Sequence, residues 1–413
     1  MEYRQQQLSN GLTILAECNN QAYFGAYGFF VRAGSRDESP DIAGVSHFLE
    51  HMVFKGTAKR SAEQVNLELD ELGSSSNART GEESTIYHAA VLPEFQTHIV
   101  DLLADLMRPA LRTDDFETEK KVIVEEIMMY QDQPPYGGHE QIMQKFFIDH
   151  PLGQSVLGST ESVVGLTPEK MRAYFDRHYC PSNMAIIASG NVDFDKLVAD
   201  TDRMCGAWPA LPSTRRVAPA KPSFGFSTLH KPNSSLQYVM QLATGPAVDD
   251  DDRFAMRVLS TILGDDGGSR VFWDMVDTGL AESAGIGSYE YGGAGLVMSY
   301  FCCDPKEAQE NIQRLHRLQE DAQLGVTEKE LHLAKQKIVS HILLASERTE
   351  SRMFSVGGQW LNFQEFKSPA EIAGLYSQVT LAQVNAVARK YPLTRNRTLS
   401  IGPRADLIPA TTN

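Results

Sequence analysis

The chain of 413 residues carries one pattern twice, and this internal repeat limits its fold more than any other feature. In the first half, residues 28–34 form an apolar run that ends at a glycine, followed by a short acidic loop and a helical pattern. In the second half, residues 238–245 end at a glycine in the same way, before an acidic loop at 249–252 and a helical pattern at 254–263. The repeat predicts two homologous α+β domains, each a mixed β-sheet with helices packed on one face.

The correspondence extends through the rest of both halves. The matching helical patterns are 93–107 with 305–319 and 114–131 with 327–347, and the matching final strands are 184–188 and 398–401. A proline-rich stretch separates the two copies, and such a stretch is typical of a linker. We therefore predict a first domain at 1–208, a linker at 209–226 and a homologous second domain at 227–413.

The composition argues against several classes of partner. Lysine and arginine number 38 against 53 aspartates and glutamates, so the formal net charge of −15 disfavours nucleic acid or an anionic membrane. No stretch approaches the ~18 apolar residues of a membrane-spanning helix. Five scattered cysteines without a Cys-x-x-Cys pair indicate neither a disulfide framework nor a thiolate zinc site. The first residues show no signal peptide, so we expect a cytoplasmic protein, although a processed chain would look the same.

The motif that carries chemistry is His47-Phe48-Leu49-Glu50-His51. Two histidines four residues apart share one face of a helix, so both imidazoles can reach a single metal ion. Glu50 lies on the same face, where a carboxylate can take a proton from water at the metal. The arrangement is His-x-x-Glu-His, the reverse of the His-Glu-x-x-His motif of other zinc peptidases.

The second copy keeps the helix but has lost the residues of the metal-binding type. Aligning the glycines at the two strand ends places Val258 opposite His47 and Ile262 opposite His51. Neither valine nor isoleucine can bind a metal ion. We therefore expect one Zn²⁺ per chain, held in the first domain.

A catalytic zinc site needs a third protein ligand, and the helical segment 119–126 is the best source of one. Glu119 and Glu126 are two helical turns apart and share a face, whereas Glu125 points about a hundred degrees away. The alternative is a solvated charged face, which is the ordinary role of a run of glutamates. Spacing alone leaves both interpretations open.

Residues 47–57, a glutamate about 75 residues beyond His51 and the duplicated halves resemble the M16 zinc metallopeptidases, also called inverzincins. The resemblance covers nearly the whole chain, and the two-domain length is similar to that of the mitochondrial-processing-peptidase-like branch, M16B. It implies that Glu126 is the third zinc ligand. It also implies that Glu119 belongs to the catalytic site as a carboxylate that orients the metal ligands.

The resemblance further implies where a substrate lies. Residues 77–80 and 83–87 are similar to a family segment that forms an edge strand, to which a substrate peptide adds as a further strand. The substrate-binding residues expected on this basis are Asn77, Ala78, Thr80, Glu83 and Thr85.

The implied activity is that of a zinc-dependent endopeptidase, which hydrolyses peptides or unfolded segments inside a closed chamber. Glu50 is expected to act as the general base on zinc-activated water and then to pass the proton to the leaving amine. The alternative is a zinc-bearing subunit that is inactive alone, or a peptide-binding scaffold, within a heteromeric M16 complex. The presence of Glu50 argues against the alternative, because an inactive subunit is free to lose it.

One part of the family pattern is missing from this chain. Active members carry an arginine and a tyrosine in the second half that hold the substrate and stabilise the oxyanion, but the matching positions here are Met275 and Glu282. We expect Arg270 to be structural, and Tyr289 and Tyr291 are nearby candidates to replace the missing donors. The resemblance implies either a homodimer with a rearranged oxyanion donor or a heterodimer with a related M16 chain that supplies the Arg/Tyr pair.

Overall fold

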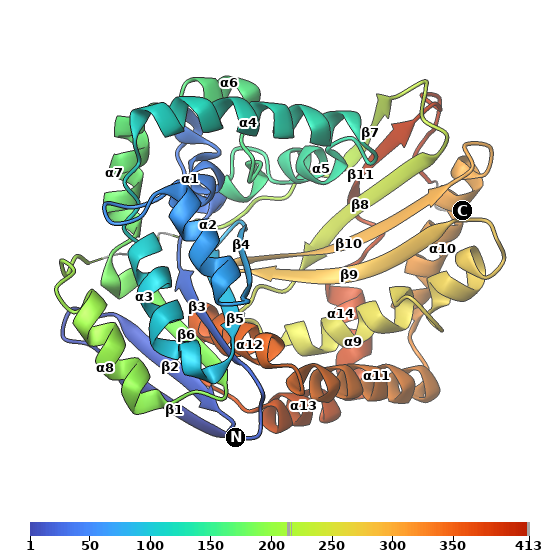
Figure 1. Ribbon diagram of the computed structural model, residues 1–413. Helices are drawn as coiled ribbons and strands as arrows, with labels where there is room; N and C mark the ends of the chain where they lie inside the picture. Colours follow the sequence, from blue (N-terminus) through green and yellow to red (C-terminus); the bar gives the residue numbers. More distant parts are fainter. Residues whose placement is uncertain (213–214, 216, 411–413) are drawn as a thin grey trace. The chain divides into compact units, whose positions relative to one another are not determined.

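The computed structural model describes residues 1–212, 215 and 217–410, which form two compact units (Figure 1). The first unit takes its described residues from 1–128, 154–216 and 344–367, and the second from 129–153, 217–343 and 368–413. Each unit is therefore assembled from segments of both sequence halves. The predicted linker overlaps the segment between the last helix of the first half and Gly225, in which the described residues form neither helix nor strand. Residues 213–214 and 216 of that linker lie outside the described residues, and the domain boundaries stay a prediction.

The first unit is built on a six-stranded mixed sheet with the order β1-β2-β6-β3-β5-β4. Its strands are β1 Glu2–Gln7, β2 Thr13–Cys18, β3 Gly25–Val31, β4 Ser75–Thr80, β5 Thr85–Val91 and β6 Met184–Gly190. β2 and β6 run parallel, and all other neighbours are antiparallel. The inner strands β3 and β6 are buried along their whole length because both faces of the sheet are covered.

Helices gather on one face of this sheet, and α12 covers the other. The first group comprises α1 Val45–Val53, α2 Ala62–Glu71, α3 Gln96–Leu106, α4 Thr113–Asp132, α6 Thr160–Val164, α7 Pro168–His178 and α8 Phe194–Cys205. α12 Thr349–Phe363 packs across β2, β3 and β6 (Figure 1). It approaches closely because position 357 is a glycine, and a Cβ there would collide with the ring of Phe30.

The second unit is built on a five-stranded sheet with the order β7-β11-β8-β10-β9. Its strands are β7 Gly225–His230, β8 Gln237–Gly245, β9 Ser283–Tyr291, β10 Ala294–Cys303 and β11 Asn396–Gly402. The helices on one face are α9 Asp252–Gly264, α10 Ala308–Leu324, α11 Glu328–Ser346, α13 Pro369–Ser377 and α14 Leu381–Lys390. α5 Gly138–Phe146, from the first sequence half, packs on the other face against β8 and β11.

The two sheets confirm the internal repeat. The order β2-β6-β3-β5-β4 in one unit matches β7-β11-β8-β10-β9 in the other, strand for strand in chain order and in parallel or antiparallel pairing. A threonine side chain caps the corresponding helix in each half, Thr167 at the start of α7 and Thr380 at the start of α14. The α+β class with two mixed sheets is therefore confirmed. The expectation that helices pack on one face of each sheet omits α5 and α12. α5 belongs to the first sequence half but covers the second face of the second sheet, and α12 belongs to the second half but covers the second face of the first sheet.

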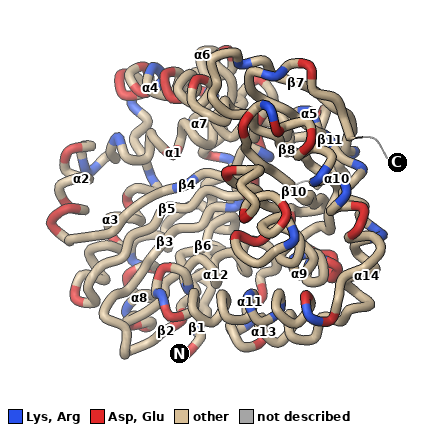
Figure 2. Tube along the Cα trace, turned by 90° about the vertical axis from the view of Figure 1, so that its right-hand side faces the viewer, with Lys and Arg blue, Asp and Glu red and all other residues tan. Residues whose placement is uncertain are grey.

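The charges of the chain are interspersed along its elements (Figure 2). α4 in particular carries acidic residues along much of its length, with two lysines among them. In the part of the chain that the structure describes, no helix is both long and apolar enough to cross a membrane.

A buried ion pair ties α12 to the first sheet. Arg352 of α12 donates from Nε to Oε2 of Glu17 on β2 at 2.5 Å, and both side chains are about 5% exposed or less. Breaking a buried pair leaves one charge without compensation in a medium of low dielectric constant. The pair should therefore affect stability far more than an exposed pair of the same chemistry.

Replacing Arg352 by leucine should lower the free energy of unfolding by about 3–5 kcal/mol, because Glu17 then stays buried and unpaired. Urea denaturation followed by circular dichroism measures this. Arg404→Leu is the matched control, since Arg404 pairs with the exposed Asp406 and its loss should cost under about 1 kcal/mol. Equal losses for the two variants would contradict the prediction, and adding Glu17→Leu to Arg352→Leu should recover much of the stability.

Candidate metal centre

Helix α1 separates its apolar and its polar side chains onto opposite faces. Its buried apolar residues follow helical spacing, and they are Val45, Phe48, Leu49, Met52 and Val53. This spacing leaves His47, Glu50 and His51 together on the other face. The predicted helix, and the predicted common face of the two histidines, are therefore confirmed.

Helix α4 brings a carboxylate to the same place. Phe116, Ile123 and Ile127 anchor one side of α4 in the core of the first unit. Glu119 and Glu126 lie two turns apart, and both reach α1. The alternative of a solvated charged face is wrong for these two glutamates, whereas Glu125, which points away from them, is exposed.

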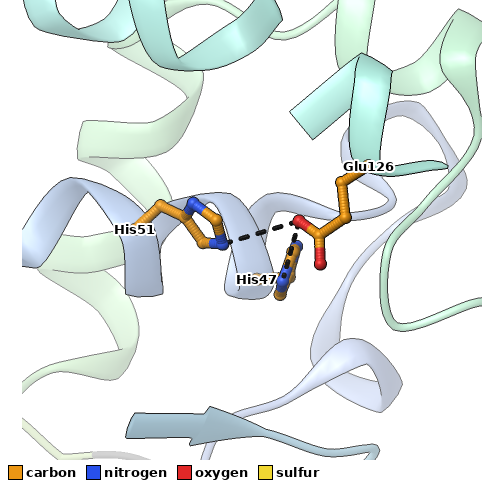
Figure 3. Close-up of side chains that lie close together, drawn as sticks. All are labelled: His47, His51 and Glu126. Carbon is orange, nitrogen blue, oxygen red and sulfur yellow. Dashed lines mark ion pairs between the residues drawn. The ribbon is translucent and has the colours of Figure 1, made fainter. Parts of the chain in front are cut away.

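The three predicted ligands converge in space (Figure 3). One oxygen of Glu126, Oε2, lies 3.8 Å from Nε2 of His47 and 3.7 Å from Nε2 of His51. One ligand atom from each residue can be chosen so that all lie within 4.8 Å of one another. Ligands ~2.1 Å from a tetrahedral zinc ion are roughly 3.4 Å apart, so these donors fit one zinc ion after a small adjustment.

The electrostatics of the site favour the protonation states that bind a metal. Burial and the neighbouring His51 lower the pKa of His47 to about 4, so its imidazole is neutral near pH 7. A neutral imidazole is the form that donates an electron pair to a metal ion. Burial raises the pKa of Glu126, which a cation at the site would counteract.

A second carboxylate holds one of the imidazoles in place. Nδ1 of His51 is 2.9 Å from Oε1 of Glu119, and the other oxygen of Glu119 pairs with Nζ of Lys55 at 2.5 Å. Although burial acts to raise the pKa of Glu119, the bonds from Lys55 and His51 outweigh it and lower the pKa. The ionised Glu119 accepts the proton of Nδ1, which directs the lone pair of Nε2 toward Glu126.

Glu50 reaches an adjacent part of the sheet. Its Oε2 accepts a hydrogen bond of 2.5 Å from Oγ1 of Thr80, the last residue of β4. Burial raises the pKa of Glu50, and the bond from Thr80 opposes that shift only in part. The candidate base and the edge strand are therefore in direct contact.

Comparisons with known proteins bear on this geometry. Residues 13–160 match the insulinase family, peptidase family M16, and residues 165–338 match the M16 inactive domain. An "Uncharacterized zinc protease" of Mycobacterium tuberculosis is 33% identical over 409 residues, which cover 97% of this chain and 93% of the relative. Another from Bacillus subtilis is 32% identical over 388 residues, covering 92% and 93%. The chain belongs to the M16 peptidase family.

Solved structures share the M16 fold with this chain. A protease from Helicobacter pylori has a TM-score of 0.91 at 20% identity, covering 97% of this chain and 99% of that one. A peptidase M16 inactive-domain protein from Pseudomonas fluorescens has a TM-score of 0.90 at 17% identity, covering all of both chains. These structures show the fold, whereas the family models and the two relatives confirm the expected M16 family of zinc proteases, and the M16B branch within it stays a proposal.

The edge-strand position expected of an M16 substrate site is confirmed for β4. β4 stands last in the sheet order and pairs with β5 on one side. It carries Asn77, Ala78 and Thr80, and Oδ1 of Asn77 accepts the N–H of Ala78. Their contact with a substrate stays a prediction.

Two other expected substrate residues make internal bonds. Oε1 of Glu83 pairs with Nη1 of Arg36 at 2.7 Å, and Oγ1 of Thr85 donates to the backbone oxygen of Ala33 at 2.9 Å. The Thr85 side chain is fully buried. In this conformation both side chains support the strand, and a contact with substrate stays a prediction here too.

The positions of the missing Arg/Tyr pair all lie in the second unit. Met275 is buried in the core of that unit, and Glu282 is exposed. Arg270 donates from Nε to Glu330 at 2.7 Å, in agreement with the structural role predicted for it. Tyr289, a predicted replacement, is 45% exposed on β9.

Three contacts near the site were absent from the sequence interpretation. Lys55 and His51 both contact Glu119. They are four residues apart, a spacing that brings side chains together on a helix and could have suggested that they share a partner. The bond from Thr80 to Glu50 joins residues 30 positions apart, and no local pattern predicts it. Glu38, shortly before α1, accepts the N–H groups of Gly44 and Ser46 at the start of that helix, and burial raises its pKa to about 8.

Glu119→Gln should lower zinc affinity about 10–100-fold, because the amide cannot hold both Lys55 and the protonated Nδ1 of His51 as an ionised carboxylate does. Competition between the protein and a chelator of known affinity measures the change. Glu125→Gln, on the exposed side of the same helix, is the matched control and should bind zinc as the wild type does. Equal affinities for all three proteins would contradict the orienting role of Glu119.

Proposed function

We propose that this chain is a zinc-dependent endopeptidase whose single catalytic metal ion is held by His47, His51 and Glu126. The observation that carries the proposal is the convergence of two nitrogens and one oxygen from α1 and α4 in a chain of the M16 family. Two histidines and one glutamate are a frequent ligand set of catalytic zinc sites, in which the fourth position is left for water or substrate. Zinc supplies Lewis acidity there, lowering the pKa of water toward ~7 and polarising a carbonyl.

Glu50 has the role of general base in this proposal. Thr80 fixes one oxygen of its carboxylate, and the helical spacing places the group on the same face as both imidazoles. The carboxylate takes a proton from the attacking water and later delivers it to the nitrogen of the leaving amine. A positioned general base of this kind accelerates a reaction typically 10²–10⁴-fold.

The substrate peptide is proposed to add to the free edge of β4. The strand ends at Thr80, whose side chain bonds to Glu50, so a peptide paired with β4 would run past the general base. Pairing through backbone groups places few demands on the substrate sequence but requires an extended chain. We therefore propose peptides and unfolded segments as the substrate class, enclosed in a chamber as the family resemblance implies.

The same resemblance underlies the proposed assembly. We assign the chain to the two-domain M16B branch and propose that it works either as a homodimer or with a related M16 chain. In either arrangement the oxyanion donor is not Met275 or Glu282, because a thioether and a carboxylate cannot stabilise an oxyanion as arginine and tyrosine do. A zinc-bearing subunit that needs such a partner for activity, or binds peptides without cleaving them, is the second candidate function.

Glu50→Gln should bind zinc as the wild type does but cleave a quenched fluorescent peptide at least about a hundredfold more slowly, because the ligands are intact and the base is lost. Zinc content and cleavage are measured on the same preparations. Near wild-type cleavage by the zinc-loaded variant would contradict the role of Glu50.

Removing the metal ion from the wild type with a chelator should abolish cleavage, and adding zinc should restore it. The same assay separates the two candidate functions. A wild-type chain with full zinc occupancy that cleaves no peptide until a related M16 chain is added would favour the partner-dependent subunit over the self-sufficient endopeptidase.

A further inference from the structure

The two histidines of the metal centre are held in different ways. Nδ1 of His51 bonds to Glu119, which fixes the orientation of its ring. Nδ1 of His47 is buried, and within the described residues it has no hydrogen-bond partner. The ring of His47 must therefore be placed by the backbone that carries it and by its packing.

That backbone is the first turn of α1, where N–H groups lack partners within the helix. A serine, threonine, aspartate or asparagine at the N-cap normally accepts one of these N–H groups. Here the N-cap is Gly44, with φ of +91°, and a Cβ at this position would lie 2.6 Å from the backbone oxygen of Leu157. The local geometry thus disfavours any residue with a capping side chain.

Glu38 provides the cap from the preceding loop. Its Oε2 accepts the N–H of Gly44 at 2.6 Å, and its Oε1 accepts the N–H of Ser46 at 2.7 Å. The side chain is almost fully buried, with 4% of the residue exposed. One carboxyl group therefore bridges the N-cap and the second residue of the helix, directly before His47.

The side chain of Ser46 provides a second attachment. Its Oγ is 2.7 Å from the hydroxyl of Tyr174 on α7, and both atoms are buried. The residue next to His47 is thus held through its N–H by Glu38 and through its hydroxyl by Tyr174. These two buried contacts on Ser46, together with the bond from the N–H of Gly44 to Glu38, restrain the first turn of the helix.

We propose that Glu38 is a positioning residue for the metal ligand His47: by capping α1 it sets where the Nε2 of His47 stands relative to His51 and Glu126. Glu119 does the corresponding task for His51 through a direct bond to the ring. The inference rests on the proposed function, since it takes His47 to be a zinc ligand.

The test titrates folded protein with zinc ion alone, by calorimetry, so that weak binding is also measured. Glu38→Leu should weaken zinc binding by roughly tenfold or more, within the range found for residues that support metal ligands. Glu38→Gln, which keeps the shape and one acceptor, should weaken it less and guards against a misfolded leucine variant. Ser61→Ala is the matched control, because Ser61 caps α2 through the N–H of Gln64 and its loss should lower the melting temperature without changing zinc affinity.

A double-mutant comparison separates positioning from general damage. In a His47→Ala background, zinc binds through His51 and Glu126, so Glu38→Leu should cause no further loss, whereas Glu119→Gln should still weaken binding. Folded Glu38 variants with wild-type zinc affinity, or an equal loss in both backgrounds, would overturn the inference. A wild-type chain that binds no zinc would instead overturn the proposed function, and with it this inference.

Discussion

Two imidazoles on one turn of a helix can bind the same metal ion only if that turn is rigid and a third donor arrives from elsewhere in the fold. In this chain the rigidity comes from the apolar face of α1, which is buried in the core of the first unit. The third donor comes from α4, whose own apolar residues are buried in the same core. The metal centre thus depends on the packing of two helices whose hydrophobic faces set the directions of their polar ones.

The internal repeat shows the same scaffold without a metal centre. The second sheet repeats the strand order and pairing of the first, and α9 occupies the place of α1 in the chain order. The positions aligned with the two histidines are Val258 and Ile262, and both are buried in a hydrophobic core. Polar ligands in a buried place are costly unless a metal ion or a hydrogen bond satisfies them. Aliphatic residues fill the same positions without that requirement.

The sequence predicts the helices and strands, and the common helix faces of the candidate metal ligands, well because both depend on short-range periodicity. Helical spacing places His47, Glu50 and His51 on one face, and the two-turn spacing from Glu119 to Glu126 extends the argument to a second helix. That the two helices meet, however, is a tertiary fact, for which the sequence interpretation relied on the family resemblance. The bond from Thr80 to Glu50 and the cap from Glu38 join a loop or strand to a helix, so no period in the sequence reveals them.

The least predictable feature is the exchange of α5 and α12, because an amphipathic helix does not encode which of two similar sheets it will cover. This exchange has a consequence for how the chain matures. The apolar surface formed by β2, β3 and β6 is covered by residues 349–363, which leave the ribosome well after these strands. Until then a growing chain presents an open hydrophobic sheet face, a kind of surface that chaperones bind and that promotes aggregation. Burial of this face thereby depends on synthesis of residues 349–363, and a product truncated before them would be left exposed to degradation.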